Sequence, residues 1–405
     1  MHASLFSALI LCSTPPSLSS SAPSMSRPML QPQISGPVIP WRRSNVRHTS
    51  NELYVDILES LSVIIAPSGR PLSAFAYGSV AFTAKVSGVP DLLLALSCPG
   101  NRSSFLQIVQ LPVFHPCVRL AIWKVRPGEL SFIPPDGRFM LMGYEVDLLG
   151  PSYLEDTASN KSTAPKLHLP ASADVRTGLG PAGDEFEVRL LLDPKFAANS
   201  SYSTSAPPAL GAGRRQASTS ANPTVEDIVV RIAIPADVKN LRELRASKGQ
   251  ATYNPGGESI EWQISGREAS TLISTMRSAD VGVAATLRAT VIGQEADVLG
   301  DSDPKEAETY EYTDDTAPYQ TQAQPEQKPS ADETGNSKIK ERNRLLMPSS
   351  ATVSFSVKGW LPSGLKVDKL FVDPQRSKGL GSGVSPYKGV KYLTASRDGI
   401  EVRCP

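Results

Sequence analysis

Histidine and cysteine are the residue types in this chain that most readily do chemistry, and one pair of them lies close together in the sequence. His115 and Cys117 are two positions apart in a segment typical of a strand, so their side chains point to the same face. A cysteine activated by a nearby histidine is a nucleophile. Neighbours on one strand seldom align a nucleophile with its base, so we expect His115 and Cys117 to serve packing rather than catalysis.

A glycine-rich segment, 379–383 (GLGSG), is the second chemical candidate, because glycine-rich loops cradle phosphates. It lacks the Lys-Ser/Thr ending of a P-loop and the strand-to-helix context of a dinucleotide site, so we expect a flexible loop. The four cysteines are far apart and form no metal-ligand spacing, which favours reduced thiols. The sequence therefore predicts a protein that is not an enzyme and that carries no metal or cofactor.

Charge and composition narrow the class of protein. The 405 residues include 41 Lys and Arg against 40 Asp and Glu, a formal net charge of +1, so no global electrostatic attraction to nucleic acid is expected. The sequence contains no apolar run of the roughly 18–20 residues that a membrane-spanning helix needs. The 35 prolines and 29 glycines disfavour a helix bundle.

The amino-terminal segment differs in composition from the rest of the chain. Residues 1–36 hold ten Ser and five Pro with a single charge, Arg27, so we expect 1–39 to be a disordered leader. The apolar stretch 5–12 loosely resembles a signal-peptide core, although no Lys or Arg precedes it. A secreted β-sandwich adhesin or hydrolase stays open as an alternative. Glycans on the sequon residues Asn101 or Asn199 would support that class.

Period-2 alternation of apolar residues begins near Asn51, where Leu53, Val55 and Ile57 alternate with more polar neighbours. Short strands separated by turns, without helical periods between them, predict an all-β fold, an elongated two-lobed antiparallel β-sandwich with disordered inserts. Expected features of that fold are two short strands within 72–86, a strand at 130–133 with its return strand at 139–146, a long loop over 151–183, and disordered inserts at 198–222 and 297–347.

Five short phrases, in a fixed order, carry a resemblance to a known family. They are PWRR at 40–43 followed by RHTSNELYVD at 47–56, FHPCVR at 114–119, LSFIPPDGRFMLMGY at 130–144, PSGLK at 362–366 and KGVKY at 388–392. Together they resemble the carboxy-terminal mu-homology domain of clathrin-adaptor medium (mu) chains. The closing phrase is most similar to the medium chain of adaptor-protein complex 3, and the insert lengths resemble those of fungal members. The resemblance covers residues 40–405, with no counterpart to the family's amino-terminal longin domain, so we expect a fragment or a late start of the gene model.

The resemblance implies a two-lobed sandwich that binds cytosolic tails carrying Tyr-x-x-Φ, where Φ is a bulky apolar residue, as an added strand. Its tyrosine pocket falls on Tyr54, Asp56, Thr83 and Lys391. Asp56 would accept a hydrogen bond from the ligand phenol and repel a phosphotyrosine. Lys391 takes the place of a common Arg, while Thr83 takes that of a common basic residue. Lys391 still provides a cation, although it lacks the planar fork of Arg, whereas the departure at Thr83 predicts a less cationic pocket.

The Φ pocket implied by the resemblance falls on Leu53, Val55, Val367, Leu370 and Val390. Without the resemblance, the same five residues would be ordinary members of a sandwich core. Gly389 stands where the family commonly has a packed Trp, which predicts a more open pocket and weaker or differently tuned peptide binding.

The partners implied by the resemblance are two large chains and a small chain of an adaptor complex, Tyr-x-x-Φ cargo tails, and a membrane surface reached through the complex. The implied location is cytoplasmic and peripheral on Golgi, endosomal and vesicle membranes. The alternative is a mu-homology scaffold that does not bind tyrosine signals. Five basic residues are either lipid contacts or solvated linker charge: Arg42, Arg43, Arg47, Arg214 and Arg215.

Overall fold

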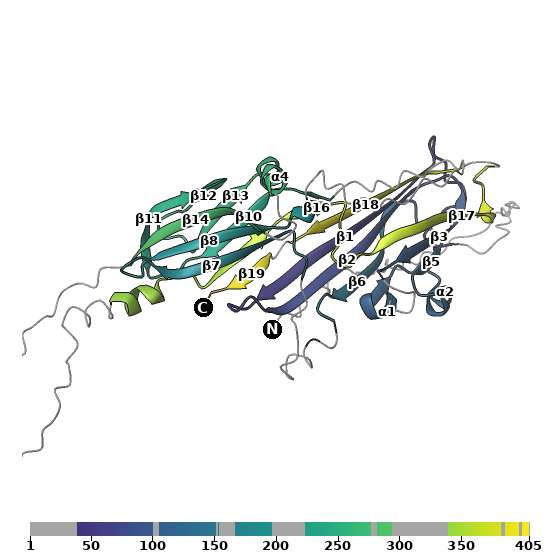
Figure 1. Ribbon diagram of the computed structural model, residues 1–405. Helices are drawn as coiled ribbons and strands as arrows, with labels where there is room; N and C mark the ends of the chain where they lie inside the picture. The colour runs from purple at the N-terminus through teal and green to yellow at the C-terminus, as the bar shows by residue number, and fades with distance from the viewer. Residues whose placement is uncertain are drawn as a thin grey trace, which may run out of the picture. The chain divides into compact units, whose positions relative to one another are not determined.

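The computed structural model describes residues 39–99, 105–150, 153, 167–196, 223–276, 282–293, 339–381, 385–396 and 399–404. The chain divides into two compact units, Met1–Pro40 and Trp41–Pro405, and the second contains every element named below. Residues 1–38 of the predicted leader and the insert at 198–222 lie outside the described residues, as does most of the insert at 297–347. The second unit is built mainly of β-strands, as predicted (Figure 1).

The strands form three sheets (Figure 1). The twelve-stranded sheet contains β1 (Glu52–Ile65), β2 (Pro71–Lys85), β4 (Gln110–Phe114), β6 (Gly137–Asp147), β9 (Thr224–Val225), β10 (Ile228–Ala233), β12 (Gln250–Thr252), β13 (Ser259–Ile264), β15 (Ser350–Ser354), β16 (Ser356–Lys358), β18 (Tyr387–Ala395) and β19 (Ile400–Arg403). The four-stranded sheet contains β7 (Ala171–Leu179), β8 (Glu185–Leu192), β11 (Val238–Ala246) and β14 (Gly282–Gly293). The three-stranded sheet contains β3 (Val89–Ser97), β5 (Glu129–Phe132) and β17 (Lys366–Lys378).

Helices are short and few among the described residues. They are α1 (Phe105–Ile108), α2 (Leu120–Val125), the 3-10 helix η2 (Pro194–Phe196) and α4 (Gly266–Thr275), together with a helical segment at 339–345. The longest named one, α4, begins with a capping box in which Ser265 and Glu268 each satisfy the other's backbone N–H. The segment 339–345 and the buried Leu346 and Met347 after it contradict the predicted disorder of this part of 297–347.

Strand β1 organises the large sheet. It pairs antiparallel with β2 along its whole length, but parallel with β18 and then with β19. The sheet departs locally from the predicted antiparallel arrangement at this point, because the last two strands return to run beside the first one in the same direction. This arrangement places the beginning and the end of the folded unit next to each other.

Two hydrophobic cores share β1, which agrees with the predicted two lobes. Leu53, Val55 and Ile57 belong to one core, and Leu61 and Val63, farther along the same strand, belong to the other. The largest fully buried side chains are Phe82 and Phe132 in the first core and Trp262 and Phe186 in the second. The alternation read from the sequence therefore marks buried positions in both cores.

Two predictions about strands differ from the structure: the two short strands within 72–86, and the pairing of 130–133 with 139–146. The two short strands expected within 72–86 are one strand, β2, which runs continuously from Pro71 to Lys85 through Gly78. A Cβ at Gly78 would lie 2.0 Å from the ring of Tyr144, so glycine is needed here for close packing rather than for a turn. The expected return strand is also wrong, because β5 pairs with β3 while β6 pairs with β2 and β4. The turn at 134–137 therefore leads the chain from one sheet to another.

A third correction concerns the predicted loop at 151–183. Residues 171–179 form β7, which pairs antiparallel with β8. The inward residues of β7 are Ala171, Ala173 and Val175, and two small residues among three give a weak apolar alternation in the sequence. Residues 154–166 lie outside the described residues.

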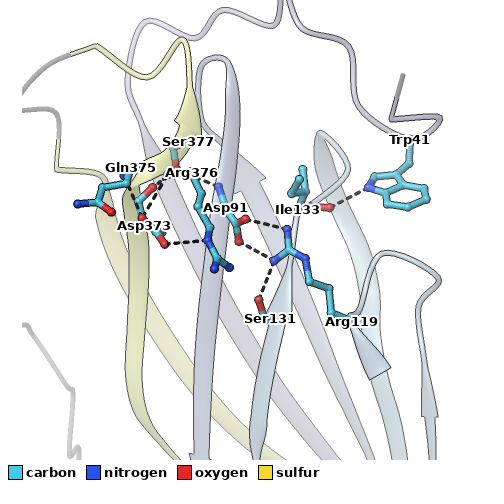
Figure 2. Close-up of polar contacts among 9 residues, drawn as sticks. All are labelled: Trp41, Asp91, Arg119, Ser131, Ile133, Asp373, Gln375, Arg376 and Ser377. Atoms are coloured by element: carbon cyan, nitrogen blue, oxygen red, sulfur yellow. Dashed lines mark hydrogen bonds and ion pairs between the residues drawn. The ribbon is translucent and has the colours of Figure 1, made fainter. Parts of the chain in front are cut away.

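Polar contacts hold β3, β5 and β17 together at one end of the three-stranded sheet (Figure 2). The guanidinium of Arg119 donates two 2.7 Å hydrogen bonds to the carboxylate of the buried Asp91 and a third to Ser131. The N–H of Asp91 donates to the Ser377 hydroxyl at 2.9 Å, beside the irregular segment of β17 that begins at Asp373. Each polar group is thus paired, as burial requires.

The first residues of the folded unit are anchored to the same region. The Trp41 indole donates to the carbonyl of Ile133 at 2.8 Å (Figure 2). Arg42 is 4% exposed and donates to the carbonyls of Gly88, Pro134 and Pro135 at 2.7, 3.2 and 3.4 Å, and also to that of Val86. Both predicted roles for Arg42, lipid contact and solvated linker charge, are wrong, because its guanidinium donates its hydrogen bonds to backbone carbonyls inside the fold.

Candidate peptide-binding site

The residues predicted for the tyrosine pocket lie on the outward face of neighbouring strands. Tyr54 and Asp56 alternate with the buried residues of β1, so the Tyr54 phenol and the Asp56 carboxylate face away from the core. In register, Tyr54 lies between Gly389 of β18 and Thr83 of β2, and Asp56 lies beside Lys391 of β18. Because paired residues share a face, the sheet brings all four predicted pocket residues together.

Tyr54 lies over Gly389. A Cβ at position 389 would come within 2.7 Å of the Tyr54 ring, so the glycine makes room for the ring. The ring also contacts Tyr387 at a centroid distance of 5.8 Å, and its hydroxyl donates to Glu52 at 3.2 Å. Desolvation and the neighbouring Glu52 carboxylate raise the pKa of the Tyr54 phenol. The expected opening at Gly389 is thus filled by a side chain of the neighbouring strand.

Asp56 forms an ion pair with Arg138, which was not among the predicted pocket residues. The Arg138 guanidinium of β6 lies 3.2 Å from the Asp56 carboxylate, with the Asp56 side chain 20% exposed and that of Arg138 61% exposed. Arg138 pairs in register with Thr83, one strand beyond β1. Its position inside the phrase at 130–144 and its alternation along β6 were visible in the sequence. The register that carries it to Asp56 was not.

Lys391 of β18 lies directly beside Asp56, and Thr83 of β2 lies one row away, beside Tyr54. Lys391 is exposed, and Thr83 is half-buried. The site thus holds the Asp56 carboxylate with a cation on each side, from Lys391 and Arg138, and a second carboxylate, Glu52, on the far side of Tyr54. Such a set can accept a hydrogen bond from a phenol and donate one to it.

The residues predicted for the Φ pocket divide into two groups. Leu53 and Val55 are 0% exposed and belong to the core, so they have no surface that a peptide can contact; the alternation along β1 turns them inward. Val367 and Val390 are half-buried, and Leu370 is buried. Two bonds bring β17 and β18 together here: Lys388 donates to the carbonyl of Leu370 at 2.7 Å, and the N–H of Val367 donates to the Tyr392 hydroxyl at 3.0 Å.

His115 and Cys117 pack as expected. The Nδ1 atom of His115 accepts a hydrogen bond from the Cys117 N–H at 3.1 Å, and the ring lies against Phe139 at a centroid distance of 5.1 Å. Burial raises the pKa of Cys117 to about 12 and lowers the pKa of His115. A thiol with that pKa is protonated at neutral pH and is a poor nucleophile.

The other chemical candidates give no site within the ranges that the structure covers. No three His, Cys, Asp or Glu side chains gather there as metal ligands. None of the helices in those ranges has the length and apolar character to cross a bilayer. Residues 382–384 of the glycine-rich segment lie outside the described residues, and Gly379 and Gly381 adopt φ of +72° and +85°. Arg43 and Arg47 are exposed, whereas Arg214 and Arg215 are not described.

This chain is similar to known proteins. A model of the adaptor complexes medium subunit family matches residues 39–404. The AP-3 complex subunit mu-2 of Mus musculus is 29% identical over 229 residues, which are 56% of this chain and 43% of that protein. The AP-3 complex subunit mu of Arabidopsis thaliana is 37% identical over 118 residues, 29% of this chain and 26% of that protein. The chain spans less than half the length of these curated relatives.

A chain in a homology model of the full-length AP-3 complex in an intermediate open conformation is similar in fold, with a TM-score of 0.46 and 18% identity. That similarity covers 87% of this chain and 68% of the other. The family model, by contrast, matches nearly the whole described sequence, from the anchored Trp41 to β19. This chain therefore belongs to the adaptor complexes medium subunit family.

Proposed function

We propose that this chain is the cargo-binding part of a vesicle-coat adaptor subunit, and that it binds Tyr-x-x-Φ signals on the face formed by β1 and β18. The observation that carries the proposal is the position of Tyr54 and Asp56 side by side on the outward face of β1, next to Lys391 of β18. Aspartate is depleted in strands, so its presence on β1 favours a functional role over a merely structural one.

The tyrosine end of the signal would contact three of these side chains. Its phenol would donate to the Asp56 carboxylate, and its ring would lie between the Tyr54 ring and the Lys391 ammonium, which can make a cation–π contact. A phosphate on the phenol would add negative charge next to Asp56, which disfavours binding. This end of the signal gives specificity for an unmodified tyrosine.

The Φ side chain would lie between β17 and β18, against Val367, Leu370 and Val390. Val367 and Val390 are partly buried and offer apolar surface at the point where Lys388 bridges the two strands, and the buried Leu370 lies beneath them in the core. Full burial of a ligand leucine is worth about 1.5–3 kcal/mol. Leu53 and Val55 support these residues from within the core and make no contact of their own.

Membership in the family, together with the AP-3 mu relatives, supports the wider setting of the proposal. The chain would assemble with two large chains and a small chain of an adaptor complex, and would be peripheral on Golgi, endosomal or vesicle membranes. It would select cargo for transport toward the vacuole or lysosome and perform no catalysis.

Calorimetric titration of the full chain with a Tyr-x-x-Leu peptide tests the proposal. Saturable binding is expected, and it should be lost with Tyr→Ala and phosphotyrosine peptides and with the Asp56→Ala protein. Asp174→Ala is the matched control, because Asp174 is also a strand aspartate paired with an arginine, at 3.4 Å from Arg176. Loss in the Asp56 variant alone supports the site, whereas equal loss in both variants contradicts it.

The second candidate function is that of a scaffold that does not bind tyrosine signals. Two observations favour it: the Tyr54 ring fills the space above Gly389, and Arg138 already pairs with Asp56. Absence of binding at high peptide concentration, with a protein that is folded by circular dichroism, would establish this candidate over the first.

A further inference from the structure

Arg138 supplies a cation to the site from a strand that does not border β1. In register, Tyr54 of β1 lies opposite Thr83 of β2, which lies opposite Arg138 of β6. Asp56 lies opposite Ala81 in the next row. The Arg138 guanidinium reaches diagonally across β2 to within 3.2 Å of Asp56.

Small residues on β2 make this reach possible. The side chains at Thr83 and Ala81 occupy the outward face of β2 between Asp56 and Arg138, and neither is long enough to block an arginine. Ala81 is only 5% exposed although it is on the outward face, which means that larger neighbours lie over it. A long side chain at position 83 would compete with Arg138 for the same space.

The chemistry of the pair matches a hydroxyl group. A carboxylate only accepts hydrogen bonds, a guanidinium only donates them, and a phenol does both. With the two groups 3.2 Å apart and the guanidinium largely exposed, one phenol oxygen can donate to Asp56 while it accepts from Arg138. Phenylalanine, which lacks the hydroxyl, would leave both groups without this partner.

We propose that Arg138 is a specificity-determining residue that, with Asp56, recognises the hydroxyl of the ligand tyrosine. The inference rests on the proposed function, since it concerns the same site. It assigns to Arg138 the cation that position 83 lacks, and it predicts a pocket that is no less cationic despite Thr83.

A double-mutant cycle tests the role of Arg138. Affinities of the full chain and of its Arg138→Met variant are measured for a Tyr-x-x-Leu peptide and for the same peptide with Phe in place of Tyr. The wild-type chain should prefer the tyrosine peptide by about tenfold or more, and the variant should lose most of that preference. Arg403→Met is the matched control, since Arg403 is a half-exposed strand arginine that lies 3.0 Å from Glu401.

A second variant separates a missing charge from a distorted surface. Thr83→Lys, added to Arg138→Met, puts a cation back in the same row, and it should restore the preference for tyrosine at least in part. A preference that is unchanged in Arg138→Met, in a protein that binds both peptides, overturns this inference alone. Failure of the folded wild-type chain to bind either peptide overturns the proposed function and this inference together.

Discussion

The hydroxyl of Tyr144 in β6 donates a 2.6 Å hydrogen bond across β2 to the carboxylate of Glu59 in β1, which is 1% exposed. The N–H of Ser363 donates to the same carboxylate at 3.1 Å, and the Ser363 hydroxyl donates as well. Ser363 belongs to the phrase at 362–366 that marks the family. A buried acid therefore joins three segments that are far apart in the sequence.

Glu59 should make the stability of the fold depend on pH. Burial raises the pKa of Glu59 above its usual value near 4.5, against the opposing effect of its three donors. The folded state therefore binds the proton more readily than the unfolded state. The stability linked to Glu59 is full below pH 4.5 and is lost as pH rises through the raised pKa.

The measurement is chemical denaturation of the wild-type chain and of Glu59→Gln across that range of pH. The free energy of unfolding of the wild type, relative to the variant, should increase as pH falls from neutral toward 4.5. A difference that stays constant with pH, or that decreases, contradicts the role given to Glu59.

Gly78 is required by the packing of Tyr144. A Cβ at Gly78 would lie 2.0 Å from the Tyr144 ring, so Gly78→Ala should lower the free energy of unfolding by about 2–3 kcal/mol. Gly143→Ala is the matched control, because the nearest atom to its Cβ is 4.0 Å away. Thermal denaturation of both variants checks this, and equal effects would show that close packing is not the reason for glycine in β2.

Arg42 should contribute strongly to stability although it comes from the first residues of the folded unit. Arg42→Met would leave up to four buried carbonyls without a donor, at a cost of about 2–4 kcal/mol. Arg43→Met, at the exposed neighbouring position, should change the free energy of unfolding by less than about 0.5 kcal/mol. Urea denaturation distinguishes the two, and a neutral Arg42 variant would contradict the structural role.

The three cysteines within the described residues, Cys98, Cys117 and Cys404, should be slow to alkylate in the native state. Burial raises the pKa of Cys98 and Cys117 to about 12 and that of Cys404 to about 11. At pH 8 their reaction with iodoacetamide should be slower than in urea by about a hundredfold or more, with Cys404 reacting first. Peptide mass spectrometry over time measures each rate. Native labelling of Cys117 as fast as in urea would contradict its assignment as a packed thiol.

Strand alternation and the family phrases made the main features of the fold predictable, but pairing partners were not. Leu53, Val55 and Ile57 identified the inward face of β1 correctly. The strands expected at 130–133 and 139–146 exist as β5 and β6, yet the sequence between them contains no information on which sheet the second strand enters. The parallel pairing of β1 with β18 joins residues more than 330 positions apart. The local sequence pattern contains no information about pairing at that separation.

The site residues likewise divide into those that the local sequence predicts and those that depend on strand pairing. Tyr54 and Asp56 were predictable from one strand, since positions two apart share a face. Arg138 reaches Asp56 only through the register of three strands, so the local sequence did not reveal it. For α4, the signal was present in the sequence: Ser265 and Glu268 have the spacing of a capping box.

The most direct test of the central claim is hydrogen–deuterium exchange of the full chain with and without a saturating Tyr-x-x-Leu peptide. Binding as an added strand on the face formed by β1 and β18 should slow amide exchange in β18, at 387–392, and in the neighbouring part of β17. The distant strand β11 should be unchanged, and the Asp56→Ala protein should show no slowing anywhere. Protection confined to another surface, or none at saturating peptide, would contradict the claim that this chain binds tyrosine signals there.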